Sequence, residues 1–409
     1  MQVRDEILGR ILAVYKRFGY QRIETPAIES IDRLTGGQGG ENEKLIYRIV
    51  KRGLPPVVPA ETPVDELIDL GLRFDLTVPL SRFYANNGDS LRLPFRSIQT
   101  GPVWRAERPQ RGRFRQFIQC DIDIVGEPTV LAEIELIEAT TAALAAVGLE
   151  GVCVRLSDRR LLTAIAETAG IASALWPAFF ITLDKLDRVG WAGVRSELGE
   201  RAVGERSVAR VEEIIAALAG CKRDDLEDEI AAALPALDSE VLDAIAGTAG
   251  GLDQLGLKYG VDWTFDPTLV RGMGYYTGQI FEVTHPDLPG SIAGGGRYDR
   301  LIEAGSGRSV PACGFSIGFE RIAEAVPAPG APPQVALLAE ADLPVADALR
   351  VARELRRDGQ RVAVLRRSGK LGSQLTRLGK WSFSAAVLVG RGEDGETTVR
   401  HIALDGSAD

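Results

Sequence analysis

A segment of alternating polarity constrains the fold more than any other part of this chain. Apolar side chains occupy one parity, at Phe114, Ile118, Cys120, Ile122 and Ile124, and polar ones the other, at Arg113, Arg115, Gln119, Asp121 and Asp123. This pattern predicts a strand with one apolar and one polar face. A second strand ends over residues 103–107, and the basic stretch 108–112 separates the two. We therefore expect an antiparallel hairpin with a long cationic loop.

The polar parity of the hairpin suggests a site for anions and cations together. Arg105 and Glu107 share a parity, and the arginines across the hairpin add further guanidinium groups that suit a polyphosphate. Gln119, Asp121 and Asp123 could recognise an ammonium or imidazole group, as could the same-parity set Arg73, Asp75 and Thr77. The alternative is a set of surface ladders in which strand arginines pair with strand acids.

Other familiar chemistries find little support. The chain has two histidines, four widely spaced cysteines without a CxxC pair, and neither a GxSxG elbow nor a Walker A sequence. Triad, P-loop, redox and zinc chemistry are therefore not indicated. The run Gly294–Asp299, GGGRYD, permits close backbone approach to a ligand, although three glycines can also form a turn or bulge.

Composition and patterning indicate a folded chain of two or three domains. With 409 residues, 45% hydrophobic and 26% charged, the chain matches globular averages. Without a long apolar run or a signal-peptide pattern, we expect a cytoplasmic protein. We expect an α/β protein with these parts: an opening helix at 5–18, a domain at 1–325 with a mostly helical insertion at about 160–255, a proline-rich linker at 326–334, and a small α/β domain with a largely parallel sheet at 335–409.

The small C-terminal domain is locally basic. Residues 350–380 contain ten basic and two acidic side chains, a local charge of +8 in a chain whose net charge is −9. This region is a candidate nucleic-acid surface. The alternative is a solvated pair of helices.

Five sequence blocks, in order, resemble one enzyme family. TGPVWRAERPQRGRFRQFIQCDIDIVG, from Thr100 to Gly126, is similar to motif 2 of class II aminoacyl-tRNA synthetases in the form found in histidyl-tRNA synthetases. FGYQRIETPAIE from Phe18 resembles motif 1, and CGFSIGFERI from Cys313 resembles motif 3. LRFDLTVPLSRF from Leu72, and LVRGMGYYTGQIFEV from Leu269 together with AGGGRYD from Ala293, resemble blocks specific to that family.

The resemblance implies a fold and an activity. The fold would contain a six-stranded antiparallel catalytic sheet, a helical insertion and a C-terminal anticodon-binding-like α/β domain, assembled as a homodimer. The activity would be that of a histidine–tRNA ligase, which activates histidine with ATP and Mg²⁺ and transfers it to tRNA(His). Partners would be histidine, ATP and tRNA(His), without a membrane and without a dedicated metal site in the protein.

The resemblance also assigns site residues. For ATP, Arg105 would hold the α-phosphate as well as the histidine carboxylate, Glu107 the adenine amino group, and Arg113 and Arg321 the outer phosphates. Arg271 would be the catalytic arginine at the α-phosphate, with Arg105 beside it. The histidine pocket would contain Asp75 and Thr77 at the amino group, Gln119, Asp123, Tyr276 and Tyr298 around the imidazole, and also Arg105, Arg271 and Tyr275.

Some features depart from the family pattern. Gly274 stands where an acidic residue is usual, and both ends of the pattern are trimmed. A different function on the same fold is therefore an alternative, namely a non-catalytic histidine-sensing paralogue such as the regulatory subunit of ATP phosphoribosyltransferase. The retained Arg105, Arg113, Arg271 and Arg321, with the basic C-terminal region, favour the synthetase.

Overall fold

The protein is described by a computed structural model that covers residues 2–36, 45–108, 114–219, 221, 223–270, 274–326, 334–381 and 383–404, without the side chains of residues 2 and 257–259. The chain forms two compact units. The large one spans Ile7–Val326, and the small one consists mainly of the chain beyond it. None of the described helices is long and apolar enough to cross a membrane.

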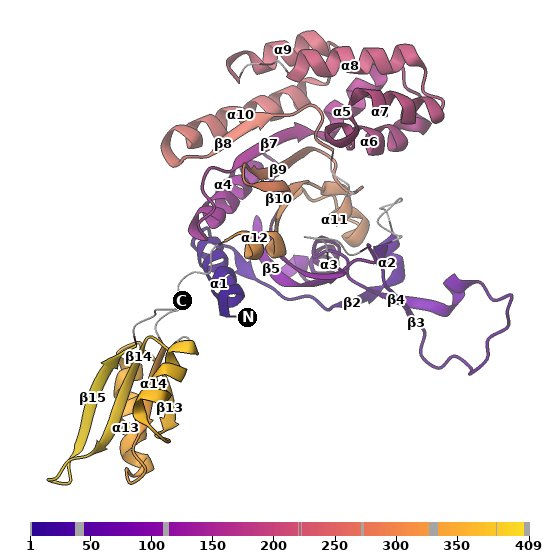
Figure 1. Cartoon of the computed structure of the whole chain (residues 1–409). Helices are drawn as coiled ribbons and strands as arrows, with labels where there is room; N and C mark the ends of the chain where they lie inside the picture. Colours follow the sequence, from indigo (N-terminus) through magenta and orange to yellow (C-terminus); the bar gives the residue numbers. More distant parts are fainter. Residues whose placement is uncertain are drawn as a thin grey trace. The chain divides into compact units, whose positions relative to one another are not determined.

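An eight-stranded sheet is the centre of the large unit (Figure 1). Its strand order is β1 (Gln21–Arg22), β5 (Phe95–Trp104), β6 (Gln116–Val125), β11 (Ala312–Gly318), β10 (Leu288–Arg297), β9 (Gln279–His285), β7 (Cys153–Asp158) and β8 (Asp262–Phe265). The six inner strands are antiparallel, and β1 and β8 pair in parallel with their neighbours. The two edge strands were not predicted, because segments of two and four residues carry almost no periodic signal.

Helices around this sheet follow from their apolar spacing. In α1 (Gln2–Arg17), Ile7, Ile11 and Tyr15 are fully buried at helical intervals. Gly19, with φ +83°, follows the helix in the left-handed region where glycine is favoured. The remaining helices of this part are α2 (Ile31–Thr35), α3 (Thr77–Asn87), α4 (Leu131–Ala146), α11 (Asp299–Ser306) and α12 (Phe319–Ala325). A small antiparallel sheet has the order β2 (Ile28–Ser30), β4 (Ile68–Leu72) and β3 (Arg48–Val50).

A group of helices is inserted between β7 and β8 and lies at that edge of the sheet (Figure 1). Asp158 caps its first helix, since the Asp158 side chain accepts a hydrogen bond from the backbone N–H of Arg160. Buried Phe179, Leu198 and Val211 belong to its own core. The helices are α5 (Arg159–Thr168), α6 (Trp176–Leu183), α7 (Leu186–Glu200), α8 (Glu205–Ala219), α9 (Leu226–Ala233) and α10 (Ser239–Tyr259).

The small unit is a four-stranded α/β fold. Its sheet has the order β13 (Arg361–Arg366), β12 (Gln334–Ala339), β14 (Ala385–Arg391) and β15 (Thr397–Ala403). The first three strands are parallel and β15 is antiparallel. Helix α13 (Val345–Arg357) packs through Val351 on one sheet face, and α14 (Leu371–Lys380) packs through Leu378 on the other. The sequence did not indicate β15, because this edge strand is mostly exposed and polar.

Candidate active site

A cavity of about 580 Å³ lies against the large sheet and collects side chains from segments far apart in the chain. Its lining includes nine of the side chains that the family resemblance assigned: Thr77, Arg105, Glu107, Gln119, Asp123, Tyr275, Tyr276, Tyr298 and Arg321. Asp75 is buried beside this set and contributes no lining atom; its Oδ1 accepts a hydrogen bond at 3.1 Å from the backbone N–H of Val78, in the first turn of α3. Arg113 and Arg271, and most of the loop at the hairpin tip, lie outside the described residues.

The alternation in β6 brings the polar side chains of that strand to the cavity. Gln119, Asp121 and Asp123 all face it, while Cys120 and Ile122 on the opposite face are fully buried. The polar face is also buried, with Asp123 only 1% exposed, because Tyr298 and the backbone at Gly314 pack against its carboxylate. The alternation in the sequence had assigned the side chains to two faces, but it did not show that both faces are buried.

A glycine on the neighbouring strand makes room for this carboxylate. In β11, Gly314 stands opposite Asp123 and Ser316 opposite Asp121. A Cβ atom at Gly314 would lie 2.1 Å from Asp123 Oδ1, so a larger residue there would displace the carboxylate. Gly314 belongs to the block that resembles motif 3, and its close approach is a constraint that the sequence motif alone does not explain.

Three buried carboxyl groups form the floor of the cavity, and their burial favours the neutral, protonated forms. Burial raises the pKa of Asp75 to about 6 and that of Asp123 to about 7. Burial and the neighbouring Asp123 raise the pKa of Asp121 well above its usual value. The family resemblance did not assign Asp121, although its strand parity placed it with Gln119 and Asp123.

Several buried acceptors of this floor have no hydrogen-bond partner among the described residues. They are Asp75 Oδ2, Asp121 Oδ1, Asp123 Oδ2 and Gln119 Oε1. Buried polar atoms are normally paired, and an unpaired acceptor costs roughly 1–3 kcal/mol. The arrangement therefore suits a ligand that carries several N–H donors and positive charge.

Tyrosines form one wall of the cavity. Tyr298 donates its hydroxyl hydrogen bond to Asp123 Oδ1 at 2.6 Å. The ring of Tyr275 lies edge-on to Tyr276 and to Tyr298, with centroid distances of 4.9 and 5.9 Å. All three rings are at most 8% exposed. The wall is therefore apolar in its body, with hydroxyl groups at defined points.

The cationic side of the cavity begins where β5 ends. Arg105 lies one residue beyond the strand, and its backbone N–H adds one more rung by donating to Arg115 O at 2.9 Å. Its Nε donates to Phe74 O at 3.0 Å, and its guanidinium stands 5.0 Å from the centroid of the Phe117 ring. The prediction that Arg105 and Glu107 lie within the strand was wrong, but both line the cavity. Arg321, on α12, donates to Ser291 O.

One predicted member of the polar set lies elsewhere. Arg73 does not line the cavity, because its guanidinium donates to Thr25 O at 2.6 Å and to Pro102 O at 3.0 Å. The strand ends at Leu72 and α3 begins at Thr77, so parity along 72–77 does not define one face. Arg73 thus fastens the β4–α3 connection and is not part of the site.

The helical insertion contributes to the cavity rim, which the sequence did not reveal. Arg155 on β7 pairs with Asp266 and lies 3.4 Å from Asp187 at the start of α7. Arg155 and Asp187 both line the cavity. Within the described residues, no three histidine, cysteine or carboxylate side chains gather as a metal site.

Comparisons with known proteins agree with this geometry. Residues 1–322 match the sequence family described as histidyl-tRNA synthetase. The chain is 43% identical to a histidine–tRNA ligase of Leifsonia xyli subsp. xyli over 415 residues, which cover 98% of this chain and 94% of that protein. It is 36% identical to a histidine–tRNA ligase of Bacteroides fragilis, over 79% of this chain and 72% of that protein.

Solved structures share the fold. The crystal structure of histidyl-tRNA synthetase from Nostoc sp. PCC 7120 superposes with a TM-score of 0.78 at 26% identity, over 98% of this chain and 93% of that one. A Bacillus halodurans protein titled ATP phosphoribosyltransferase regulatory subunit/histidyl-tRNA synthetase, 20% identical, superposes with a TM-score of 0.73 over 92% of each chain and shows the same fold. The α/β fold and the family predicted from the motifs are confirmed, and the chain belongs to the histidyl-tRNA synthetase family of enzymes.

Proposed function

We propose that this chain activates histidine with ATP to form histidyl-adenylate and transfers the histidyl group to tRNA(His). The observation that carries the proposal is the set of unpaired buried acceptors on one side of the cavity with Arg105 beside it. Histidine supplies the matching groups, namely an ammonium, imidazole N–H donors and a carboxylate. A site built from buried polar groups also rejects analogues that leave those groups unpaired.

In this proposal the two ends of histidine lie against different residues. The ammonium group binds near Asp75 and Thr77, and the imidazole lies among Gln119, Asp123 and the tyrosine wall. Asp121, between Gln119 and Asp123 on the same strand face, is available to either group. The carboxylate of histidine then points toward Arg105.

ATP would occupy the cationic side of the cavity. Arg105 contacts the α-phosphate, Glu107 the adenine amino group, and Arg321 the outer phosphates, with Arg113 and Arg271 completing the arginine set. The histidine carboxylate attacks the α-phosphorus, pyrophosphate leaves, and the arginines offset the charge that develops on the phosphoryl oxygens. The attacking carboxylate is already ionised, so the step needs no general base.

Magnesium would enter as part of the substrate. Mg²⁺ bound to nucleotides takes most of its ligands from phosphates and water, with one or two carboxylates from the protein. Glu320 lines the cavity and could supply one carboxylate. The ion would neutralise phosphate charge.

We further propose that the large unit is the catalytic domain and contains the helical insertion. A linker at 326–334 joins it to the small unit, residues 335–409, which binds the anticodon region of tRNA. The protein would act in the cytoplasm. The ten basic residues between 350 and 380 support tRNA binding through their attraction to phosphates. We also propose a homodimer. The small sheet β2-β4-β3 exposes Ile28, Val50 and Leu70, apolar side chains that a second subunit could cover.

The direct test is ATP–pyrophosphate exchange with each of the twenty amino acids in turn. Exchange with histidine alone is expected, because the donors of its ring and amino group match the buried acceptors. Exchange with no amino acid, in protein that still binds histidine, would favour a histidine-sensing role and refute the ligase. Charging of total tRNA then tests the transfer step, and light scattering tests the dimer.

A further inference from the structure

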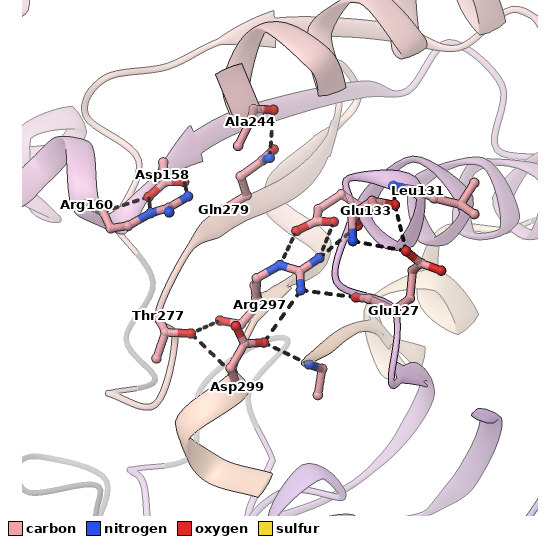
Figure 2. Close-up of polar contacts among 12 residues, drawn as sticks. Glu127, Leu131, Glu133, Asp158, Arg160, Ala244, Thr277, Gln279, Arg297 and Asp299 are labelled. Atoms are coloured by element: carbon pink, nitrogen blue, oxygen red, sulfur yellow. Dashed lines mark hydrogen bonds and ion pairs between the residues drawn. The ribbon is translucent and has the colours of Figure 1, made fainter. Parts of the chain in front are cut away.

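A buried ion pair ties the end of β10 to α4 (Figure 2). It lies on the sheet face opposite the cavity, because Arg297 stands in register with Cys313 and Ile124. Arg297 Nε lies 2.6 Å from Glu133 Oε1, and Arg297 Nη2 lies 2.7 Å from Glu133 Oε2. The two side chains are 12% and 1% exposed. Arg297 also donates to the carbonyl oxygens of Glu127 at 3.3 Å and Thr129 at 3.1 Å. The guanidinium is thus fixed by a bidentate carboxylate and two backbone groups.

The next residue reaches the other way, into the cavity. Successive side chains of an extended segment point to opposite faces, so Arg297 faces α4 while Tyr298 faces Asp123. Tyr298 makes the 2.6 Å hydrogen bond to Asp123 described above. The position of its hydroxyl group therefore depends on a backbone that the Arg297–Glu133 pair anchors from behind.

The same anchor holds the turn that carries the other two tyrosines. Thr277 N–H donates to Arg297 O at 2.8 Å, and Asp299 N–H donates to Thr277 Oγ1 at 3.2 Å. A Cβ atom at Gly278 would lie 3.3 Å from Arg297 Cδ, so the turn packs directly against the stem of the arginine. Figure 2 shows Thr277, Arg297 and Asp299 in this network. Tyr275 and Tyr276 directly precede Thr277 and Gly278 in this turn.

We propose that Arg297, paired with Glu133, is a positioning residue for the histidine pocket. It acts from behind the sheet, through Tyr298 and through the turn that carries Tyr275 and Tyr276. This inference rests on the proposed function, which places histidine against those rings. Arg105, Glu107 and Arg321, the described residues assigned to ATP, belong to other segments, so loss of the pair is expected to weaken histidine binding far more than ATP binding.

The chain provides a matched control on the same helix. Arg96 on β5 pairs with Glu135 on α4, with both nitrogen–oxygen distances at 2.6 Å. This pair also fastens α4 to the sheet in bidentate geometry. Arg96 is next to Ser97, which does not line the cavity. A merely structural role would be common to both pairs, whereas a positioning role belongs to Arg297 and Glu133.

The experiment compares Glu133→Gln and Arg297→Lys with Glu135→Gln and Arg96→Lys in the full chain. Histidine affinity is measured by calorimetry without ATP, and the KM values for histidine and ATP by pyrophosphate exchange. We expect the first two variants to lose about tenfold in histidine affinity, a difference of about 1.4 kcal/mol. Their KM for ATP should change by less than about twofold, as should every parameter of the control variants. Thermal unfolding of all four shows which have folded.

A double-mutant cycle tests whether Arg297 acts through Tyr298. In a Tyr298→Phe background, Arg297→Lys should cost clearly less histidine affinity than in the wild type, because the hydrogen bond it positions is already gone. Three outcomes would each overturn the proposal. They are fully additive losses of histidine affinity in the double mutant, an equal loss of histidine affinity in the Glu135→Gln variant, and parallel rises in the KM values for histidine and ATP. Wild-type protein that binds histidine without exchange would refute the ligase activity alone, since calorimetry still tests the positioning role. Wild-type protein that does not bind histidine would overturn both.

Discussion

The two faces of β6 are both buried and are opposite in chemistry. On one face Cys120, Ile122 and Ile124 are fully buried in the core. On the other, Gln119, Asp121 and Asp123 are nearly as buried, yet keep acceptors without partners. Two ion pairs at the back of the sheet behave differently, since Arg297–Glu133 and Arg96–Glu135 are bidentate pairs. Packing and these two pairs stabilise the back, while the front gathers unpaired carboxylate and amide oxygens that a ligand could satisfy.

The largest effect should come from Arg105, on the cationic side of the cavity. Arg105→Ala is expected to lower the rate of histidine-dependent pyrophosphate exchange roughly a thousandfold, because it removes charge stabilisation from the phosphoryl transition state. The free energy of unfolding should change little. Arg308→Ala, which removes an exposed arginine paired with Asp89, is the control and should leave exchange unchanged. An Arg105→Ala rate within tenfold of wild type would remove Arg105 from the proposed site.

Shortening a side chain on the apolar face of β6 should lower stability and leave histidine binding nearly unchanged. Ile122→Ala is expected to lower the free energy of unfolding by about 3 kcal/mol, because it leaves a cavity in a fully packed core. At a temperature where the variant is folded, its KM for histidine should stay close to the wild-type value. Denaturant unfolding and exchange kinetics measure the two quantities. A large rise in KM with little loss of stability would break the distinction between the faces.

Asp123→Asn should trade function for stability. The pKa of Asp123 is raised to about 7 in the folded protein, so the folded state holds the proton more tightly than the unfolded state. Wild-type stability therefore falls as pH rises from the usual carboxyl range, near 4, to about 7. The Asp123→Asn variant does not lose stability in this way. The difference in unfolding free energy between the variant and the wild type should therefore shift by roughly 3 kcal/mol in favour of the variant between pH 5 and pH 8. Histidine affinity should drop in the same variant.

Denaturant midpoints at the two pH values, compared with those of the wild type, measure this prediction. A constant difference between the proteins would show that Asp123 is ionised throughout the range, and that the cavity is more polar than its burial indicates.

The smallest effect separates neighbouring residues on the two faces. Cys120→Ala should cost roughly 1 kcal/mol of stability, since a small fully buried side chain is shortened. Histidine affinity should be unchanged, because the side chain faces away from Gln119 and Asp123. Calorimetry provides the check, and a tenfold loss of affinity would contradict the assignment of faces.

Much of the site could be predicted because motifs lie on regular elements. The period of two along β6 assigned Gln119 and Asp123 to one face, and the resemblance added Tyr276, Tyr298 and Arg321 from distant blocks. The prediction that Arg73 shares a face with Asp75 and Thr77 was wrong. Strand parity applies only along a continuous strand, and β4 ends at Leu72. Asp187 could not be predicted, since its approach to Arg155 depends on how the insertion packs.

The sequence by itself determined the family, the two-faced strand and the residue types that meet in the cavity. Tertiary structure decided which face is open to a ligand, because alternation separates two faces without saying what covers either of them. It also decided the pairing of Arg297 with Glu133, which are 164 positions apart, and of Arg96 with Glu135. Such pairs form only where long-range packing brings the groups together, and no local pattern records that contact.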